Sequence, residues 1–418
     1  MIPPEDTTLL STRGTTTCRG CGSRALESVL DLGEQPLSNE LLHLPDASES
    51  FYPLHLRICT LCGLGQVGEV VPPETIFAEY PYLSSVSSSW LEHSRRYAHQ
   101  AIEELRLGGE SLVIEVASND GYLLKQIAEL GVPVLGVEPA RNVAEIASRD
   151  GVSTVNAFFG RDTAAALLES HGHPDLIVAN NVMAHVPDLD DFVGGFALLC
   201  ASETVVTVEN PSFTRLLTET QFDTIYHEHY SYLSAHAVAA TVALHDLELF
   251  RVEHLSTHGG SYRYWIAPRG SRPVEPSVQA AVEAELSAGL LGSELRNAFE
   301  QRSRATIQGL RDWFTERASA GATVVGYGAA AKGNTLLNAA RVKPTQMIAV
   351  VDANRQKQGM YLPGSRIPVV GPEGLAALSA TDVLLLPWNL RAEIMPIIAR
   401  LVPGATTWVA VPTMTTLP

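Results

Sequence analysis

The fold is decided by the stretch Val113-Ile114-Glu115-Val116-Ala117-Ser118-Asn119-Asp120-Gly121, an apolar run that passes into a loop of short side chains. A helical pattern follows over residues 122–130, so the stretch predicts a strand, a tight loop and a helix. Further apolar runs at residues 134–137, 176–179 and 204–208 alternate with helical patterns. This alternation predicts an α/β fold, a doubly wound and mainly parallel sheet with helices on both faces.

Carboxylates mark the first two strands of this unit. Glu138 ends the second strand about 20 residues after the loop, where an acidic side chain can accept hydrogen bonds from both ribose hydroxyls of an adenosine. Glu115, with the exposed amides of the loop, can hold an ammonium and a carboxylate. This is the binding pattern of a class I methyltransferase, although Ala117 stands where such enzymes usually carry Gly. The pattern predicts an S-adenosylmethionine site made of Glu115, Ala117, Ser118, Asn119, Gly121, Glu138, Asn180 and Asn181. A doubly wound sheet without adenosine is the alternative.

A second α/β unit follows a helical region at residues 278–318, with strands expected at 323–326, 347–351, 383–386 and 407–411. Its first loop, Gly326-Tyr327-Gly328-Ala329-Ala330-Ala331-Lys332, satisfies G-x-G-x-x-G/A, and Asp352 ends the next strand. Both features favour a dinucleotide site in a Rossmann-like domain. The same helix N-terminus, with Lys332, Lys357 and Arg366, can instead bind the pyrophosphate of a sugar nucleotide, which we favour because methyl transfer needs no nicotinamide. A purely structural glycine-rich turn is the third possibility.

Four of the five cysteines form two CxxC pairs, Cys18/Cys21 and Cys59/Cys62. Two residues between thiolates let a tight turn aim both sulfurs at one tetrahedral ion. Four thiolates fill the coordination of zinc, so the pattern predicts a structural zinc site. Two unrelated thiol pairs or a redox site are the alternatives.

The whole chain has 418 residues and a net charge of -17, which disfavours a nucleic-acid partner because phosphate contacts need basic surface. No apolar run is long enough to span a membrane, and residues 1–14 lack the pattern of a secretion signal. We therefore expect a cytoplasmic protein that acts on a small molecule. Its oligomeric state stays open.

The most distinctive motif is Tyr226-His227-Glu228-His229-Tyr230-Ser231-Tyr232, which follows the strand at 204–208. Imidazole is a base near neutral pH, and a neighbouring carboxylate or phenol can orient it. The motif lacks the HExxH period of a helical metal site, and chance histidines in a surface loop are the alternative. Similar polar and aromatic residues surround Tyr80, His185 and His258-Gly259-Gly260, where glycines permit close backbone approach.

Taken in this order, these motifs resemble the sugar C-methyltransferases that make the branched deoxysugars of antibiotics. The resemblance runs from Leu32-Gly33-Glu34-Gln35-Pro36-Leu37 to residues 352–372 and is most specific at residues 226–233. It implies a zinc-binding module at residues 1–75, a central S-adenosylmethionine-binding methyltransferase domain at 76–275 and a Rossmann-like domain at 276–418.

The resemblance also implies that His229 is the catalytic base, with Tyr226 and Glu228 beside it and Tyr80 and His185 completing the pocket. The usual substrate of the family is a dTDP-linked 4-keto-deoxyhexose that is methylated at C-3, or in some members at C-5. We expect His258 and Gly259 to bind this substrate. His227 departs from the Asp found in other members, so its role is open. An NAD-linked nucleotide-sugar oxidoreductase or epimerase, or a non-catalytic sugar-nucleotide-binding protein, is the alternative function.

Overall fold

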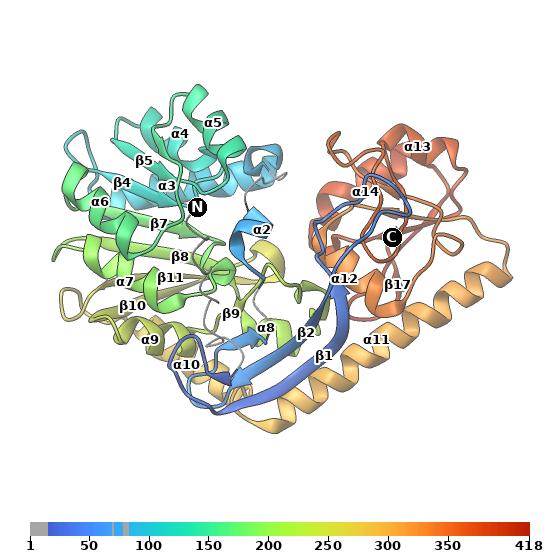
Figure 1. Ribbon diagram of the computed structural model, residues 1–418, viewed down its shortest axis with the longest axis horizontal. Helices are drawn as coiled ribbons and strands as arrows, with labels where there is room; N and C mark the ends of the chain where they lie inside the picture. The colour runs from blue at the N-terminus through green and yellow to red at the C-terminus, as the bar shows by residue number, and fades with distance from the viewer. Residues whose placement is uncertain (1–15, 69–70, 78–82) are drawn as a thin grey trace, which may run out of the picture.

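The structure is a computed structural model that describes residues 16–68, 71–77 and 83–418. Three sheets organise it (Figure 1), with strand orders β1-β2-β3-β9, β10-β11-β8-β7-β4-β5-β6 and β14-β13-β12-β15-β16-β17. The predicted α/β class is confirmed, and the two larger sheets form separate lobes joined by a long hairpin and a long helix.

The seven-stranded sheet carries the motif at 113–121 on its central strand. From β8 to β6 its strands are parallel, whereas β10 and β11 form an antiparallel edge that the sequence patterns did not reveal. Its strands are β4 (Val113–Val116), β5 (Val134–Val137), β6 (Thr154–Val155), β7 (Leu176–Asn180), β8 (Val205–Pro211), β10 (Leu247–Leu255) and β11 (Ser261–Pro268).

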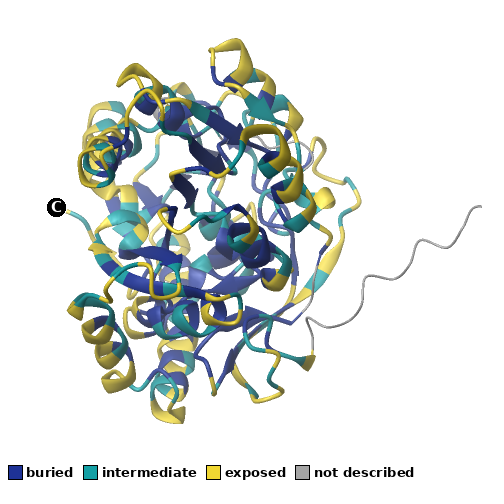
Figure 2. Cartoon of the chain, turned by 90° about the vertical axis from the view of Figure 1, so that its left-hand side faces the viewer, coloured by how far each residue is buried: buried dark blue, intermediate teal, exposed yellow. Residues whose placement is uncertain are grey.

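Helices cover both faces of this sheet, as expected. Helices α3 (Ser88–Leu105), α4 (Tyr122–Glu129) and α5 (Arg141–Arg149) pack on one face, and α6 (Arg161–His171), α7 (Leu189–Leu199) and α9 (Ala235–Ala243) on the other. Figure 2 shows the buried strands enclosed by helices with exposed outer faces. Within the described part of the chain, no helix combines the length and apolar character needed to cross a bilayer.

The N-terminal sheet links the lobes. Strands β1 (Leu26–Pro36) and β2 (Phe51–Cys59) form a long antiparallel hairpin, β3 (Gly65–Val67) pairs with β2, and β9 (Ser231–Tyr232) pairs with β3. The last pairing matters for the site, because β9 directly follows the histidine motif. Helices α2 (Pro73–Phe77) and α8 (Phe213–Thr218) lie between this sheet and the seven-stranded sheet (Figure 1).

Helices α10 (Pro276–Ser287) and α11 (Ser293–Ser319) replace the single helical region expected from sequence. The Glu285 carboxylate of α10 accepts the backbone N–H groups of Ala235 and His236, so α10 lies against the methyltransferase lobe. The 27-residue α11 then runs to the C-terminal lobe (Figure 1). That lobe contains β12 (Val324–Tyr327), α12 (Ala331–Ala340), β13 (Val350–Val351), β14 (Val369–Val370), α13 (Pro372–Ala377), β15 (Asp382–Leu385), α14 (Arg391–Leu401), β16 (Thr406–Val409) and β17 (Thr415–Thr416).

Candidate active site

The loop after β4 has the backbone shape of a cofactor loop. Ala117, Asn119 and Gly121 have φ angles of 56°, 50° and 76°, all in the left-handed region. Ala117 adopts this conformation despite its Cβ, at a cost of about 1–2 kcal/mol. Ala117 thus adopts a backbone conformation that favours glycine. At Gly121 no side chain fits, because a Cβ would lie 2.9 Å from Val152 Cγ2.

Glu138, at the end of β5, is held against this loop. Its Oε2 accepts the Asn119 N–H at 2.9 Å and its Oε1 accepts the Ala140 N–H at 2.8 Å. These bonds fix the carboxylate plane, while burial raises the carboxyl pKa. Each oxygen has a second lone pair, so the fixed carboxylate can still accept a ribose hydroxyl.

Unpartnered polar atoms lie around the loop. Leaving such an atom buried without a partner costs about 1–3 kcal/mol, so a cluster of them indicates a ligand that hydrogen-bonds there. Burial also raises the Glu115 pKa well above its ordinary value, and a cationic ammonium group beside it would reverse that shift. The residues fit S-adenosylmethionine. Among the described residues, the unpartnered atoms at this edge are Glu115 Oε1 and Oε2, Ser118 Oγ, Asp120 Oδ1, Asn180 Oδ1 and Asn181 Oδ1.

His229 occupies the loop between the short helix Phe222–Thr224 and β9. Its Nδ1 lies 2.9 Å from the Thr224 carbonyl oxygen, and because a carbonyl only accepts, Nδ1 carries the proton. Nε2 is therefore the basic nitrogen, and it accepts the Tyr226 hydroxyl at 2.9 Å. Burial and the neighbouring His185 hold the His229 pKa well below its usual range. The imidazole is thus neutral near pH 7.

His185 meets His229 from the other side of the site. It ends the turn Met183–His185 after β7, and the two ring centroids lie 4.8 Å apart at 64°. Burial lowers the His185 pKa to about 4, so this ring is also neutral near pH 7. Phe77 of α2 packs edge-on against it at 5.6 Å. Tyr80 lies outside the described residues.

The side chains of Glu228 and His227 leave the same loop but contact different partners. Glu228 is 3% exposed, its Oε1 accepts the Asn39 amide at 2.6 Å, and burial raises its pKa to about 7. His227 instead places Nε2 3.2 Å from the Tyr52 carbonyl oxygen of β2. Its ring packs edge-on against Tyr52, so His227 contacts the hairpin rather than His229.

The loop at residues 257–260 brings His258 and Gly259 to the same edge. His258 Nε2 lies 3.5 Å from Asn181 Nδ2, and the Trp90 ring of α3 lies 5.3 Å from the His258 ring. Gly259 has a φ of 88°, and a Cβ there would lie 2.7 Å from Trp388 Cη2 of the C-terminal lobe. The glycine therefore lets the two lobes approach closely.

Lys332 lies at the N-terminal end of α12, facing the histidine loop. Its Nζ donates to Asn389 Oδ1 at 2.8 Å and lies 4.7 Å from the Trp388 ring centroid. Trp388 Nε1 donates in turn to the buried Asp223 Oδ2 at 2.7 Å. Burial lowers the Lys332 pKa and raises that of Asp223 to about 6. These contacts join Lys332, Trp388 and Asp223 into one connected group on the C-terminal side of the site.

Lys357 and Arg366 have other partners. Lys357 Nζ donates to the Ala329 carbonyl at 2.8 Å, whereas Arg366 forms a 2.6 Å ion pair with Glu49. Asp352, the carboxylate that a dinucleotide site would offer to ribose, accepts the N–H groups of Ala329 and Asn354, each at 2.8 Å. The lobe thus uses this carboxylate to brace its own loop.

The four cysteines predicted to bind zinc converge. Their sulfur atoms all lie within 4.8 Å of one another, with Cys18–Cys62 at 3.5 Å and Cys21–Cys59 at 3.6 Å. A tetrahedral site with Zn–S bonds of about 2.3 Å requires sulfurs about 3.8 Å apart. The donor set and its size fit a structural zinc ion with four thiolate ligands.

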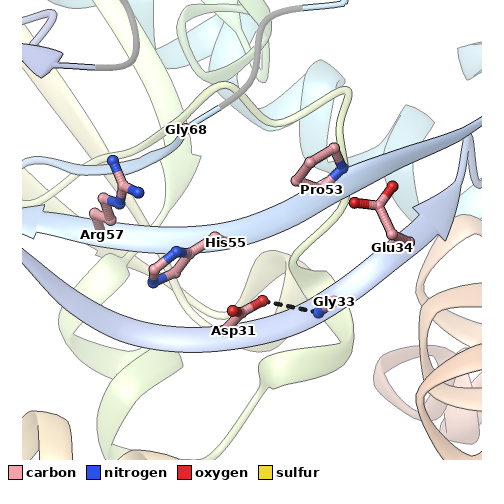
Figure 3. A pocket seen from close by; sticks show the side chains of 7 residues that line it. All are labelled: Asp31, Gly33, Glu34, Pro53, His55, Arg57 and Gly68. Atoms are coloured by element: carbon pink, nitrogen blue, oxygen red, sulfur yellow. Dashed lines mark hydrogen bonds between the residues drawn. The ribbon is translucent and has the colours of Figure 1, made fainter.

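A separate groove of about 220 Å³ lies on the hairpin, lined by Asp31, Gly33, Glu34, Pro53, His55, Arg57 and Gly68 (Figure 3). Asp31 accepts the Gly33 N–H there, and His55 Nε2 lies 2.9 Å from Ser28 Oγ. None of the residues assigned to cofactor, substrate or zinc lines it. We assign it no ligand.

Comparison with known proteins identifies the family. The chain is 33% identical to the C-methyltransferase NovU of Streptomyces niveus over 381 residues, which cover 90% of this chain and 91% of NovU. The chain belongs to the C-methyltransferase family. Three domain families match in order: "Putative zinc binding domain" at residues 18–77, "Methyltransferase domain" at 90–252 and "C-methyltransferase C-terminal domain" at 256–412. The enzyme is thus an S-adenosylmethionine-dependent C-methyltransferase with a zinc module.

Solved structures resemble only part of this C-methyltransferase. Magnesium protoporphyrin IX methyltransferase from Synechocystis PCC 6803, with bound SAM, is 14% identical with a TM-score of 0.32; the match covers 43% of this chain and 79% of that one. A SAM-dependent methyltransferase from Anabaena variabilis is also 14% identical with a TM-score of 0.34, covering 48% of this chain and all of that one.

Some residues of the site were missed by sequence reasoning. Asn39 and Trp388 stand in segments without a motif, so nothing marked them. Asp223 and Asn334 lie just outside the motifs at residues 226–232 and 326–332, and no sequence signal marked a role for them. Asn334 is 1% exposed, and neither its Oδ1 nor its Nδ2 has a partner among the described residues, so it is a further candidate for ligand binding beside Lys332.

Proposed function

We propose that this C-methyltransferase methylates a carbon alpha to the ketone of a dTDP-linked 4-keto-deoxysugar, with His229 as the base. The observation that carries the proposal is the state of His229. Its Nδ1–H donates to a backbone carbonyl, which leaves a neutral Nε2 lone pair facing Tyr226 and His185. A proton beside a ketone is weakly acidic, so its removal requires a base fixed in this way.

Removing the proton leaves an enolate, whose oxygen needs a hydrogen-bond donor. Tyr226 donates to Nε2 in the structure, and a substrate that takes this position frees the phenol to donate to the enolate oxygen. His185, neutral and half-buried, offers a second N–H. Both donors are uncharged, which suits a group that must stabilise a transient anion without binding water strongly.

S-adenosylmethionine supplies an electrophilic methyl group for the resulting carbanion. The protein's task is to bring the two together and to exclude water, which would otherwise return a proton to the enolate. The proposed cofactor residues end β4, β5 and β7, and His185 follows β7 directly. The two halves of the site therefore share one edge of the sheet.

For the nucleotide, we assign the pyrophosphate to the N-terminal end of α12. Lys332 provides a cation there, and helix N-termini attract phosphate through their exposed N–H groups. His258 and Gly259 face the same space from the methyltransferase lobe. Methyl transfer needs no nicotinamide, which favours this assignment over nicotinamide-dependent oxidoreductase or epimerase chemistry.

The test is isotopic. In heavy water, the parent enzyme with S-adenosylhomocysteine should exchange the proton alpha to the ketone, and His229→Ala should not, while turnover falls roughly 10²-fold or more. His227→Gln is the matched control, because it changes the neighbouring imidazole that contacts Tyr52 instead. Exchange by His229→Ala at the parent rate would assign the base to another group, with Tyr80 or His185 the next candidate.

A further inference from the structure

A loop of the N-terminal module reaches the C-terminal lobe. This connection, residues 37–50 between β1 and β2, we call the strap. Leu42 and Tyr361 exchange two backbone hydrogen bonds of 2.8 Å, and Glu49 pairs with Arg366 at 2.6 Å. Ser38 Oγ lies 3.3 Å from Thr335 Oγ1 of α12. The strap is therefore fixed at both of its ends, and Figure 1 shows it beside α12.

One strap residue enters the candidate active site. Asn39 Nδ2 donates to Glu228 Oε1 at 2.6 Å, and Glu228 directly precedes His229. Among the described residues, Asn39 is the side chain that donates a hydrogen bond to the Glu228 carboxylate. A donor fixed on Oε1 restricts rotation of the carboxylate plane and leaves Oε2 free to contact the substrate.

We propose that Asn39 is a positioning residue that orients the Glu228 carboxylate from the zinc module's strap. The inference rests on the proposed function, because it assumes that Glu228 contacts the sugar beside His229. The active site then draws on all three parts of the chain. This explains why the strap is tied so firmly to the C-terminal lobe: any slack in it would be transmitted to Glu228.

Other groups face Glu228 but do not replace this contact. Lys357 of the C-terminal lobe acts on Glu228 through its charge, and the Tyr230 phenol feels the charge of Glu228 in turn. His185 meets the backbone of Glu228 rather than its carboxylate. Within the described part of the chain, the Asn39 amide is the side-chain group that donates a hydrogen bond to this carboxylate.

A double-mutant cycle tests the proposal. Asn39→Leu and Glu228→Gln should each lower turnover at least about 10-fold, and the double variant should be no slower than Glu228→Gln alone. Effects that multiply, or an Asn39→Leu variant as active as the parent, would overturn it. Gln35→Leu is the control, because it removes an amide of β1 that donates to the Leu32 carbonyl rather than to Glu228. Should Asn39→Leu fail to fold, the isosteric Asn39→Asp enters the same cycle.

A second measurement, of the Glu228 carboxyl group itself, needs no substrate. The carboxyl band that disappears in Glu228→Gln can be followed by infrared titration. Losing the Asn39 donor, which favours the charged form, should raise the pKa of that band in Asn39→Leu. An unchanged titration would overturn the contact itself. If the titration shifts but the parent never methylates a keto-sugar, the contact stands and the proposed function fails.

Discussion

At His185 burial lowers the imidazole pKa to about 4, whereas at Glu228 it raises the carboxyl pKa to about 7. The ordinary order of protonation is thus reversed in this site. Near pH 6, the imidazoles of His185 and His229 are neutral, while the Glu228 carboxyl group still holds a proton. The cause is shared, because a low-dielectric pocket disfavours every charged form, whichever its sign.

The raised pKa of Glu228 predicts a pH-dependent gain in stability for Glu228→Gln. Between about pH 4.5 and pH 7 the folded state keeps a proton that the unfolded chain has lost, so folding becomes less favourable as pH rises through this window. The variant should match the parent at pH 4 and exceed it above pH 7, by on the order of 1–3 kcal/mol. Denaturant unfolding across this range measures the difference. Glu103→Gln, an exposed change on α3, should show no such trend, and a pH-independent gap for Glu228→Gln would contradict the assignment.

Substitution of Glu138 should weaken cofactor binding. Glu138→Ala removes the ribose acceptor and also frees the N–H groups of Asn119 and Ala140. Calorimetry should show S-adenosylhomocysteine binding weakened by about 1–3 kcal/mol, or roughly 5- to 150-fold. Glu145→Ala, an exposed change on the nearby α5, should bind like the parent. Equal affinity in Glu138→Ala and the parent would place the adenosine elsewhere.

Residues that belong to a local motif could be foreseen, and residues that act across the fold could not. The four cysteines were predicted because their spacing alone encodes a metal site, and the structure brings their sulfurs together. Glu115 and Glu138 were assigned from strand ends, and their roles remain predictions. Asn39 could not be found this way, since its partner Glu228 lies 189 residues away.

Among the elements, the buried parallel strands were predicted within a few residues, because an apolar run bounded by turns has few other readings. The β1–β2 hairpin was missed. Its register shifts between Ser28 and Leu30 and again between Asp31 and Glu34, and such bulges break the alternation that marks a strand. The break between α10 and α11 was also missed, although Gly289, with a φ of 87°, terminates the first helix.

Gly259 lies where the methyltransferase lobe contacts the C-terminal lobe, and a substitution there tests that contact. In Gly259→Ala the new Cβ would lie 2.7 Å from Trp388, which must then move away from Asp223 and Lys332. The KM for the sugar nucleotide should rise about 10-fold or more, since 1.4 kcal/mol of lost contact corresponds to that factor. Gly270→Ala is a matched control, because Gly270 also has a positive φ but no atom within 4 Å of its Cβ. A KM equally changed in both variants would attribute the effect to backbone strain rather than to Trp388.

Across the whole molecule, the zinc module holds the catalytic loop from both sides. Arg19, inside the first CxxC pair, donates to the carbonyls of Tyr230 and Val67 at 2.7 and 3.0 Å. Strand β9, which begins two residues after His229, is an edge strand of the module's sheet. Residues distant from the chemistry thereby fix the backbone on which His229 sits. A structural metal in a small module contributes directly to its folding.

Zinc removal should therefore lower turnover more than it weakens cofactor binding. Purified protein should contain about one zinc per chain, retained through dialysis. Chelation under mild denaturation, or Cys59→Ser, should loosen β3, β9 and the strap, and lower turnover at least about 10-fold, the effect of misplacing a fixed catalytic group. S-adenosylhomocysteine binding should change less than turnover, because its proposed residues lie at the ends of β4, β5 and β7, whose strands are hydrogen-bonded to one another and not to the sheet of the zinc module. Cys200→Ser controls for the loss of a thiol outside the cluster.

Two outcomes would contradict these expectations. Metal analysis that finds no zinc, with Cys18 and Cys62 freely alkylated in the native protein, would refute the zinc site. A zinc-free enzyme with full turnover would show that the metal is not needed to position the catalytic loop.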